Sequence, residues 1–408
     1  NRAFFFGSYE GQRLRRSQTQ VFAVPESTRR TGDFSDAAAP LCDPLTRTAS
    51  GGCVPFPGNR IPNDRLDRVA LALLARVPQP TTPGAVQNLV AVGNQVNPSD
   101  QFSLRLDYGP RETDRLYARG TTFRVRDEQP FGTSALNESL VPGFGRIVTT
   151  RSENVAVGHT HTFSPRWLTE TRMGYLHAAG GQASVNRGVD FAQLAGLRGV
   201  TADTRDMGYP QVAFAGLYSP IGDPPSFVSR NNRSLELYHN VMYERARHRT
   251  KFGAYLFSLW FNPENPTNAR GTFSFNGQWT GNAFADFLLG YPSSAQVGIG
   301  RADEHGRSTW LHAYAQDEWR ASGNLTINYG LRYELNGQMA DSGNRLSAVD
   351  VDGRRFVVAS DSMGRLSPAA SALLDQMPLP YVTSAEAGWT RGLLRPSYRR
   401  FAPRVAMA

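Results

Sequence analysis

The sequence predicts an all-β chain whose strands form an antiparallel, up-and-down β-barrel in a membrane. Three observations predict this fold. Side chains alternate between apolar and polar over segments of about ten residues, the length of a tilted strand that crosses a bilayer. Short and long connections take turns between these segments, as they do in outer-membrane barrels. No stretch approaches the roughly 18 to 20 consecutive apolar residues that a transmembrane helix needs.

The alternation is clearest in "LTINYGLRYEL" at 325–335. Apolar or aromatic side chains take every odd position, and polar residues or glycine take every even position. A soluble sheet would pack the apolar side against a protein core, whereas a membrane barrel turns it to lipid and keeps the polar side for its lumen. One strand fits either fold, so the rest of the chain must decide between them.

The same pattern recurs along the chain, for example where Leu104 and Leu106 alternate with Arg105 and Asp107. It is less regular at 114–124. We expect ten strands, at about 3–10, 101–109, 114–124, 150–163, 166–177, 232–244, 250–259, 308–319, 324–335 and from 401.

The connections between these strands favour the barrel. Short ones lie near 110–113, 164–165, 245–248 and 321–323. Long ones occupy about 11–100, 125–149, 178–231, 260–307 and 336–400. Compact soluble domains rarely contain structureless loops beyond about 12 to 15 residues. Barrels in the outer membrane, in contrast, have tight periplasmic turns and long external loops.

Two short helices are predicted inside the long loops, where they would cover a rim of the barrel. Residues 63–78 place Leu66, Val69, Leu73 and Val77 on one face after an Asn or Asp cap. Residues 367–378 offer Ser367 as the cap and Pro368 at the first helical position.

The basic charge does not indicate a nucleic-acid partner. The net charge is +9, but Lys251 is the only lysine among 44 Lys and Arg residues, and the arginines are scattered without a dense basic run. Cys42 and Cys53 lie 11 positions apart in a turn-rich segment, and export would oxidise them to a disulfide. The alternative is a pair of unrelated thiols in a cytosolic chain.

No motif for catalysis or cofactor binding is present, so we expect neither an enzyme nor a cofactor. His159 and His161 share a strand face, but the sequence shows no third ligand nearby. We therefore expect lipid-facing or rim histidines and no metal. Asp317 and Glu318 are adjacent in a strand and point to opposite sides, so they cannot act as an acid and base pair. Asp317 is expected to face the lumen or to contact an arginine.

Two further sets of residues follow from the barrel prediction. Aromatic residues near strand ends or on apolar positions are expected to form interfacial girdles, with core aromatics of a β-sandwich as the alternative: Trp167, Trp310, Trp319, Tyr329 and Tyr333. Charged residues on polar positions are expected to face the lumen: Arg105, Glu170, Arg172, Glu236, Arg332 and Glu334.

Five segments resemble the barrel of Oar-like TonB-dependent receptors, and they occur in the same order. They are "NRAFFFGSYEGQR" at 1–13, "DPLTRTASGGCVPFPGNRIPNDRLD" at 43–67, "RGTFSFNGQWTGNAFADFLLGYP" at 270–292, "YAQDEWRASGNLTINYGLRYE" at 314–334 and "FAPRVAMA" at 401–408. The cysteine pair is not an expected feature of this family.

This resemblance implies a bacterial outer-membrane barrel of about 22 strands, with a plug domain driven by TonB. Residues 1–408 would then be a partial barrel domain, and the plug, a regulatory-like domain and the C-terminal strands would lie outside it. The implied partners are outer-membrane lipid, TonB through the plug, and an unidentified bulky substrate. Two alternatives remain: a surface adhesin or envelope-organising protein, and a secreted soluble β-sandwich or propeller.

Overall fold

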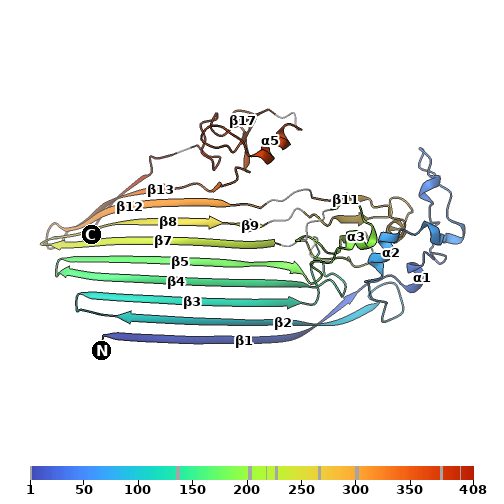
Figure 1. Ribbon diagram of the computed structural model, residues 1–408, viewed down its shortest axis with the longest axis horizontal. Coiled ribbons are helices and arrows are strands. Elements are labelled where there is room, and N and C mark those ends of the chain that lie inside the picture. Colours follow the sequence, from blue (N-terminus) through green and yellow to red (C-terminus); the bar gives the residue numbers. More distant parts are fainter. Residues whose placement is uncertain are drawn as a thin grey trace.

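The computed structural model describes residues 2–134, 138–200, 205–216, 218–225, 228–264, 268–298, 303–376, 380–395 and 397–408. Ten antiparallel strands form one sheet, and each pairs with the next along the chain (Figure 1). They are β1 (Ala3–Phe22), β2 (Leu89–Tyr108), β3 (Asp114–Gln129), β4 (Arg146–Ser164), β5 (Trp167–Ser184), β7 (Val228–Arg245), β8 (His248–Phe261), β12 (Gly306–Arg320), β13 (Thr326–Asn336) and β18 (Phe401–Met407). Short strands β9 (Pro263–Glu264) and β14 (Ala340–Asp341) pair with β7 and β12. The all-β, up-and-down fold class is confirmed.

Most strands are longer than predicted. β1 and β2 each contain 20 residues. At about 3.3 Å per residue each extends roughly 66 Å, whereas the apolar band of a membrane barrel is about 25 Å tall. The added length lies toward the long connections, where β1 continues to Phe22 and β2 already begins at Leu89. Within the added part of β1, residues 15–20 are polar on both faces, so the alternating pattern ends before the strand does.

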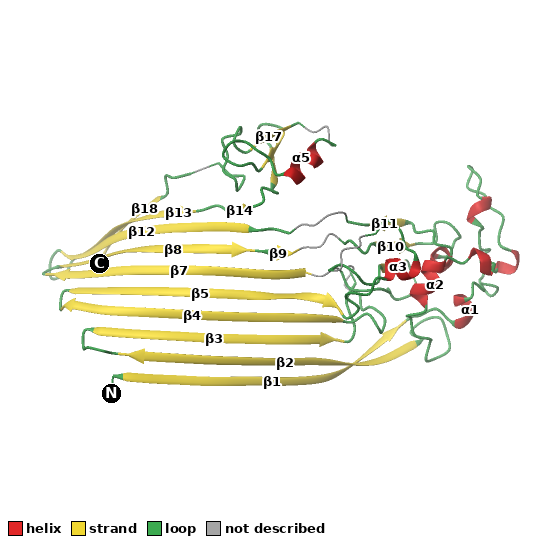
Figure 2. Cartoon of the chain, viewed as in Figure 1, coloured by secondary structure: helices red, strands yellow, loops and turns green. Residues whose placement is uncertain are grey.

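The long connections at one end of the sheet pack together into a small structure of their own (Figure 2). We call its described residues within 23–88, 130–145, 185–225 and 268–298 the loop cap. It contains the helices α1 (Ser27–Arg30), α2 (Arg68–Leu74), α3 (Phe191–Ala195) and α4 (Ala283–Leu288). Its 3-10 helices are η1 (Pro44–Thr46), η2 (Pro57–Asn59) and η3 (Asn63–Arg65), and its sheet comprises β6 (Gln211–Phe214), β10 (Thr272–Phe275) and β11 (Ser294–Gln296).

A hydrophobic core holds the loop cap together. Leu73, Phe144, Phe284 and Leu288 come from three segments of the chain and are almost fully buried in it. The helix predicted at 63–78 forms in two parts, η3 and α2. Asp67 caps α2 by accepting hydrogen bonds from the backbone N–H groups of residues 69 and 70. This helix is therefore part of the loop-cap core, whereas the sequence predicts only that it covers a rim of the barrel.

The last long connection forms a second, smaller unit. It contains β15 (Ser347–Asp350), β16 (Arg355–Val358), α5 (Pro368–Leu374) and β17 (Tyr381–Thr383), with a core around Val357, Ala359 and Leu393. Ser367 accepts a hydrogen bond from the N–H of Ala370, which confirms the predicted cap. Residues 377 and 378 of that predicted helix lie outside the described residues. Across the described ranges, no helix has both the length and the apolar character to cross a membrane.

Candidate functional site

The register of the sheet separates its side chains into two faces, because directly opposed residues of antiparallel strands point to the same side. A row of directly opposed residues runs across nine neighbouring strands through Met173. Every residue in this row is apolar: Phe5, Leu106, Ala118, Val157, Met173, Leu237, Leu256, Leu311 and Leu335. The next row, one residue along, lies on the opposite side: Phe4, Asp107, Tyr117, Gly158, Arg172, Tyr238, Tyr255, His312 and Glu334. We call these sides the apolar face and the polar face.

Among the residues that the structure describes, no second layer of protein covers the apolar face. Phe5 is 82% exposed and Leu106 is 48% exposed. Leu325 and Tyr329, from the segment with the clearest alternation, are 39% and 43% exposed. A β-sandwich would bury these side chains between its two sheets. A continuous exposed apolar surface of this extent instead requires an apolar surrounding.

The six charged residues that the sequence predicts for the lumen all lie on the polar face. They occupy three successive rows of that face. The first row contains Arg105 and Glu236, the second contains Arg172 and Glu334, and the third contains Glu170 and Arg332.

Several of these charged residues pair with a neighbour two positions along the same strand. Arg105 donates two hydrogen bonds to Asp107, from Nε and Nη2, at 2.7 and 2.6 Å. Arg172 Nε donates to Glu170 at 2.8 Å. Arg332 Nε lies 2.8 Å from Glu334. The charges therefore form short ladders along the strands.

Aromatic side chains lie beside these charges on the polar face. The ring centroids of Tyr238 and Tyr255 are 4.3 Å apart, and those of Tyr255 and His312 are 5.4 Å apart. Tyr314 donates a hydrogen bond to Asn240 at 3.0 Å. Together with Arg332 and Glu334 they line a hollow of about 760 Å³. We call it the aromatic hollow.

The aromatic hollow was missed in the sequence, although its signal is present there. In "WLHAYA" at 310–315 the large rings of Trp310, His312 and Tyr314 alternate with aliphatic residues. Both sets are apolar enough to mask the alternation, because aromatic rings also suit the lipid side of a barrel. The expectation for Trp310 is therefore wrong: it lies on the polar face, where its ring centroid is 5.0 Å from that of Phe257. Trp167, Trp319, Tyr329 and Tyr333 lie on the apolar face.

The expectation for Asp317 is also wrong. This residue lies on the apolar face, near the end of β12, and is 8% exposed. Its carboxylate accepts hydrogen bonds from the hydroxyls of Thr250 and Tyr329 at 2.9 and 3.0 Å. His248 Nδ1 lies 2.6 Å from the same carboxylate. Asp317 thus does not face the lumen, because it lies on the same face of β12 as the other odd-numbered residues, and its hydrogen-bond partners among the described residues are His248, Thr250 and Tyr329.

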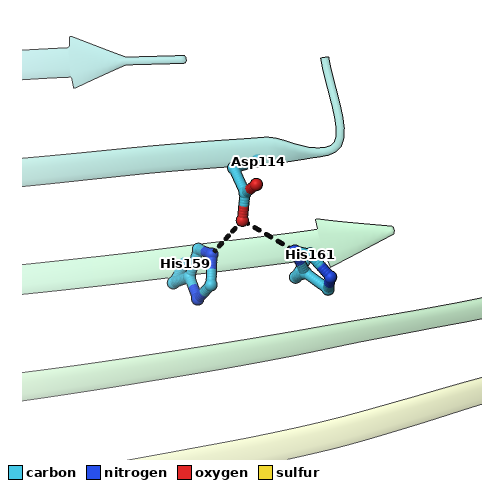
Figure 3. A group of neighbouring side chains, drawn as sticks. All are labelled: Asp114, His159 and His161. Atoms are coloured by element: carbon cyan, nitrogen blue, oxygen red, sulfur yellow. Dashed lines mark hydrogen bonds and ion pairs between the residues drawn. The ribbon is translucent and has the colours of Figure 1, made fainter. Parts of the chain in front are cut away.

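His159 and His161 lie on the apolar face close to the short-turn end of β4, as expected of rim histidines. However, the fold brings Asp114 of β3 beside both of them (Figure 3). The sequence shows no third ligand because Asp114 precedes His159 by 45 positions.

Cys42 and Cys53 form a disulfide in the loop cap, with their Cα atoms 5.8 Å apart. Asp43 follows the first cysteine and accepts hydrogen bonds from Arg65 Nη1 and Nη2 at 3.2 and 3.0 Å. The hydrogen bonds from Arg65 lower the pKa of the Asp43 carboxyl. The disulfide and this ion pair together fix the segment between β1 and α2.

Comparison with known proteins gives one match over the full length. The model of the outer membrane beta barrel domain family matches residues 1–408. None of the curated proteins compared with the chain matches it.

Similar solved structures include the outer membrane transporter YddB from Escherichia coli, with a TM-score of 0.38 and 10% identity over 62% of this chain and 30% of that one. The ferric-catecholate import receptor Fiu from E. coli K12 has a TM-score of 0.34 and 12% identity over 60% of this chain and 39% of that one. The ferric preacinetobactin receptor BauA from Acinetobacter baumannii has a TM-score of 0.35 and 11% identity over 63% of this chain and 38% of that one.

The chain spans well under half the length of each of these structures, at 30%, 39% and 38%. The family match over all residues accords with the large antiparallel sheet and its two distinct faces. The chain belongs to the outer membrane beta barrel domain family and is a protein of the bacterial outer membrane.

Proposed function

We propose that the chain is the barrel portion of a TonB-dependent outer-membrane transporter that binds and translocates a bulky substrate. The apolar face contacts membrane lipid, and the polar face lines the lumen. TonB acts through a plug domain inside the complete barrel. The five sequence segments that resemble Oar-like receptors support this proposal, as do the two faces of the sheet.

The observation that carries the proposal is the aromatic hollow on the polar face. Ligand sites combine apolar and aromatic walls with a few placed polar groups, and this hollow has rings from Tyr238 and Tyr255 beside Arg332 and Glu334. Such a surface suits a large polar molecule that also carries flat apolar parts. Its chemistry is binding and passage, and no covalent step is involved.

A comparison of strains tests this function. We would grow the source bacterium as wild type, as a deletion of the full-length protein and as a TonB-deficient strain, and analyse the solutes left in the medium by mass spectrometry. The proposal predicts that both mutants leave the same compounds unconsumed. A double variant, Tyr238→Ala with Tyr255→Ala, should slow their consumption, whereas Phe5→Leu on the apolar face should not.

The loop cap favours a second candidate function, that of a surface adhesin. It is a structured unit with its own core at the end of the long connections, and such a unit can bind other cells or polymers. An adhesin needs neither TonB nor uptake. Unchanged consumption in the deletion strain, together with lost attachment to cells or surfaces, would favour the adhesin and contradict the transporter.

A further inference from the structure

Asp114, His159 and His161 form a compact cluster at the short-turn end of β3 and β4 (Figure 3). Asp114 Oδ1 lies 2.9 Å from His159 Nε2 and 2.7 Å from His161 Nδ1. Their ligand atoms all lie within 4.8 Å of one another. Among the described residues, this is the one group of at least three His, Cys, Asp or Glu side chains that meets this spacing.

The surroundings of the cluster hold its side chains in place. The Thr113 hydroxyl donates a hydrogen bond to Asp114 Oδ2 at 2.9 Å, so one carboxylate oxygen is oriented while the other faces the imidazoles. The His161 ring packs edge-on against Phe163, with the centroids 4.2 Å apart. The side chain of Asp114 is 13% exposed, that of His161 is 25% exposed and that of His159 is 42% exposed. The cluster is thus anchored on one side and open on the other.

We propose that Asp114, His159 and His161 bind a divalent transition-metal cation of the zinc class. Imidazole nitrogen and carboxylate oxygen are ligands for such ions, and three protein ligands leave a further position for water. Ligands about 2.0 to 2.1 Å from a tetrahedral metal stand roughly 3.3 Å from each other. The two hydrogen bonds therefore need to open by about half an ångström, which small side-chain rotations provide.

The position of this site suggests its effect on the protein. The strands β3 and β4 are joined by the long connection 130–145. A metal shared by Asp114 and the two histidines links these strands at the rim. Because the ion binds the folded barrel and not the unfolded chain, it stabilises the folded state. This site is separate from the aromatic hollow, so it does not depend on the proposed transport function.

Cobalt is a suitable probe because its visible absorption reports nitrogen ligation. The full-length protein in detergent micelles is stripped with EDTA and titrated with Co²⁺. The proposal predicts one Co²⁺ per chain at this site, displaced by Zn²⁺, and at least roughly tenfold weaker binding in Asp114→Asn and His161→Gln.

His239→Gln is the matched control. His239 lies on the same face two strands away and hydrogen-bonds to Thr171, outside the cluster. Its substitution should leave Co²⁺ affinity unchanged, and circular dichroism should show that every variant is folded. Wild-type protein that binds Co²⁺ no more tightly than folded Asp114→Asn would overturn the proposal. The same conclusion would follow if His239→Gln weakened binding as much as His161→Gln does.

Discussion

Two arginine substitutions, one residue apart on β5, test which face of the sheet contacts lipid. Met173 lies six residues beyond the start of β5 at Trp167. A strand tilted by about 40° rises roughly 2.5 Å per residue along the membrane normal, which places Met173 about 15 Å from the turn and near the middle of the apolar band. It is 48% exposed, in the apolar row between Val157 and Leu237.

Met173→Arg should therefore destabilise the barrel strongly. An arginine on the lipid face near the bilayer midplane costs about 2 to 4 kcal/mol. Loss of about half of the methionine's apolar contact adds roughly 1 kcal/mol. The total of about 3 to 5 kcal/mol corresponds to a change of roughly a hundredfold to several thousandfold in the folding equilibrium.

Gly174→Arg is the control on the polar face. A Cβ at this position would lie 4.0 Å from the Cβ of Glu236, an ordinary contact, and the new charge would stand opposite a carboxylate. We expect a change within about 0.5 kcal/mol. Urea unfolding of the full-length protein in lipid vesicles, followed by tryptophan fluorescence, measures both variants. A larger cost for Gly174→Arg than for Met173→Arg would refute the assignment of the faces.

Three further predictions concern the loop cap. Replacing both Cys42 and Cys53 by Ser should destabilise it by about 3 kcal/mol, as expected from the 11-residue separation, and faster proteolysis of the cap would show this. Because Arg65 lowers the pKa of Asp43, their pair stabilises the cap fully above the unfolded pKa of about 3.9, and this stabilisation is lost as the pH falls through the lower folded value. Asp43→Asn should remove that part of the acid dependence in thermal unfolding measured below about pH 4. Asp67→Ala should cost about 1 kcal/mol through loss of the helix cap, and hydrogen exchange at the start of α2 should accelerate.

The strands could be predicted from the sequence because their alternation has a period of two and is strongest where one face is apolar. All ten predicted strands form, from β1 to β18. Their outer ends could not be predicted from this pattern. In the segment 15–20 of β1 the side chains are polar on both faces, so the two faces do not differ and no alternation remains.

The candidate sites could be predicted only where the odd or even position of a residue in its strand determines its face of the sheet. The charged residues of β5, Glu170 and Arg172, follow from the parity of Met173. The cluster of Asp114 with the histidines depends on the register between β3 and β4. Their connection spans residues 130–145, and a connection of this length does not fix a register as a tight turn does. The loop-cap core likewise depends on contacts between segments far apart in the chain.

The part of the long strands that extends beyond the apolar band sets the distance between the loop cap and the lipid headgroups. About ten residues of β1 suffice to cross the apolar band, and the other ten or so extend roughly 25 Å farther along the membrane normal. Electrostatic interactions between solvent-exposed charges are largely screened beyond about 8 Å at physiological ionic strength. The fixed charge of the membrane surface therefore contributes little at the cap. A charged ligand arriving there responds to the side chains of the cap itself.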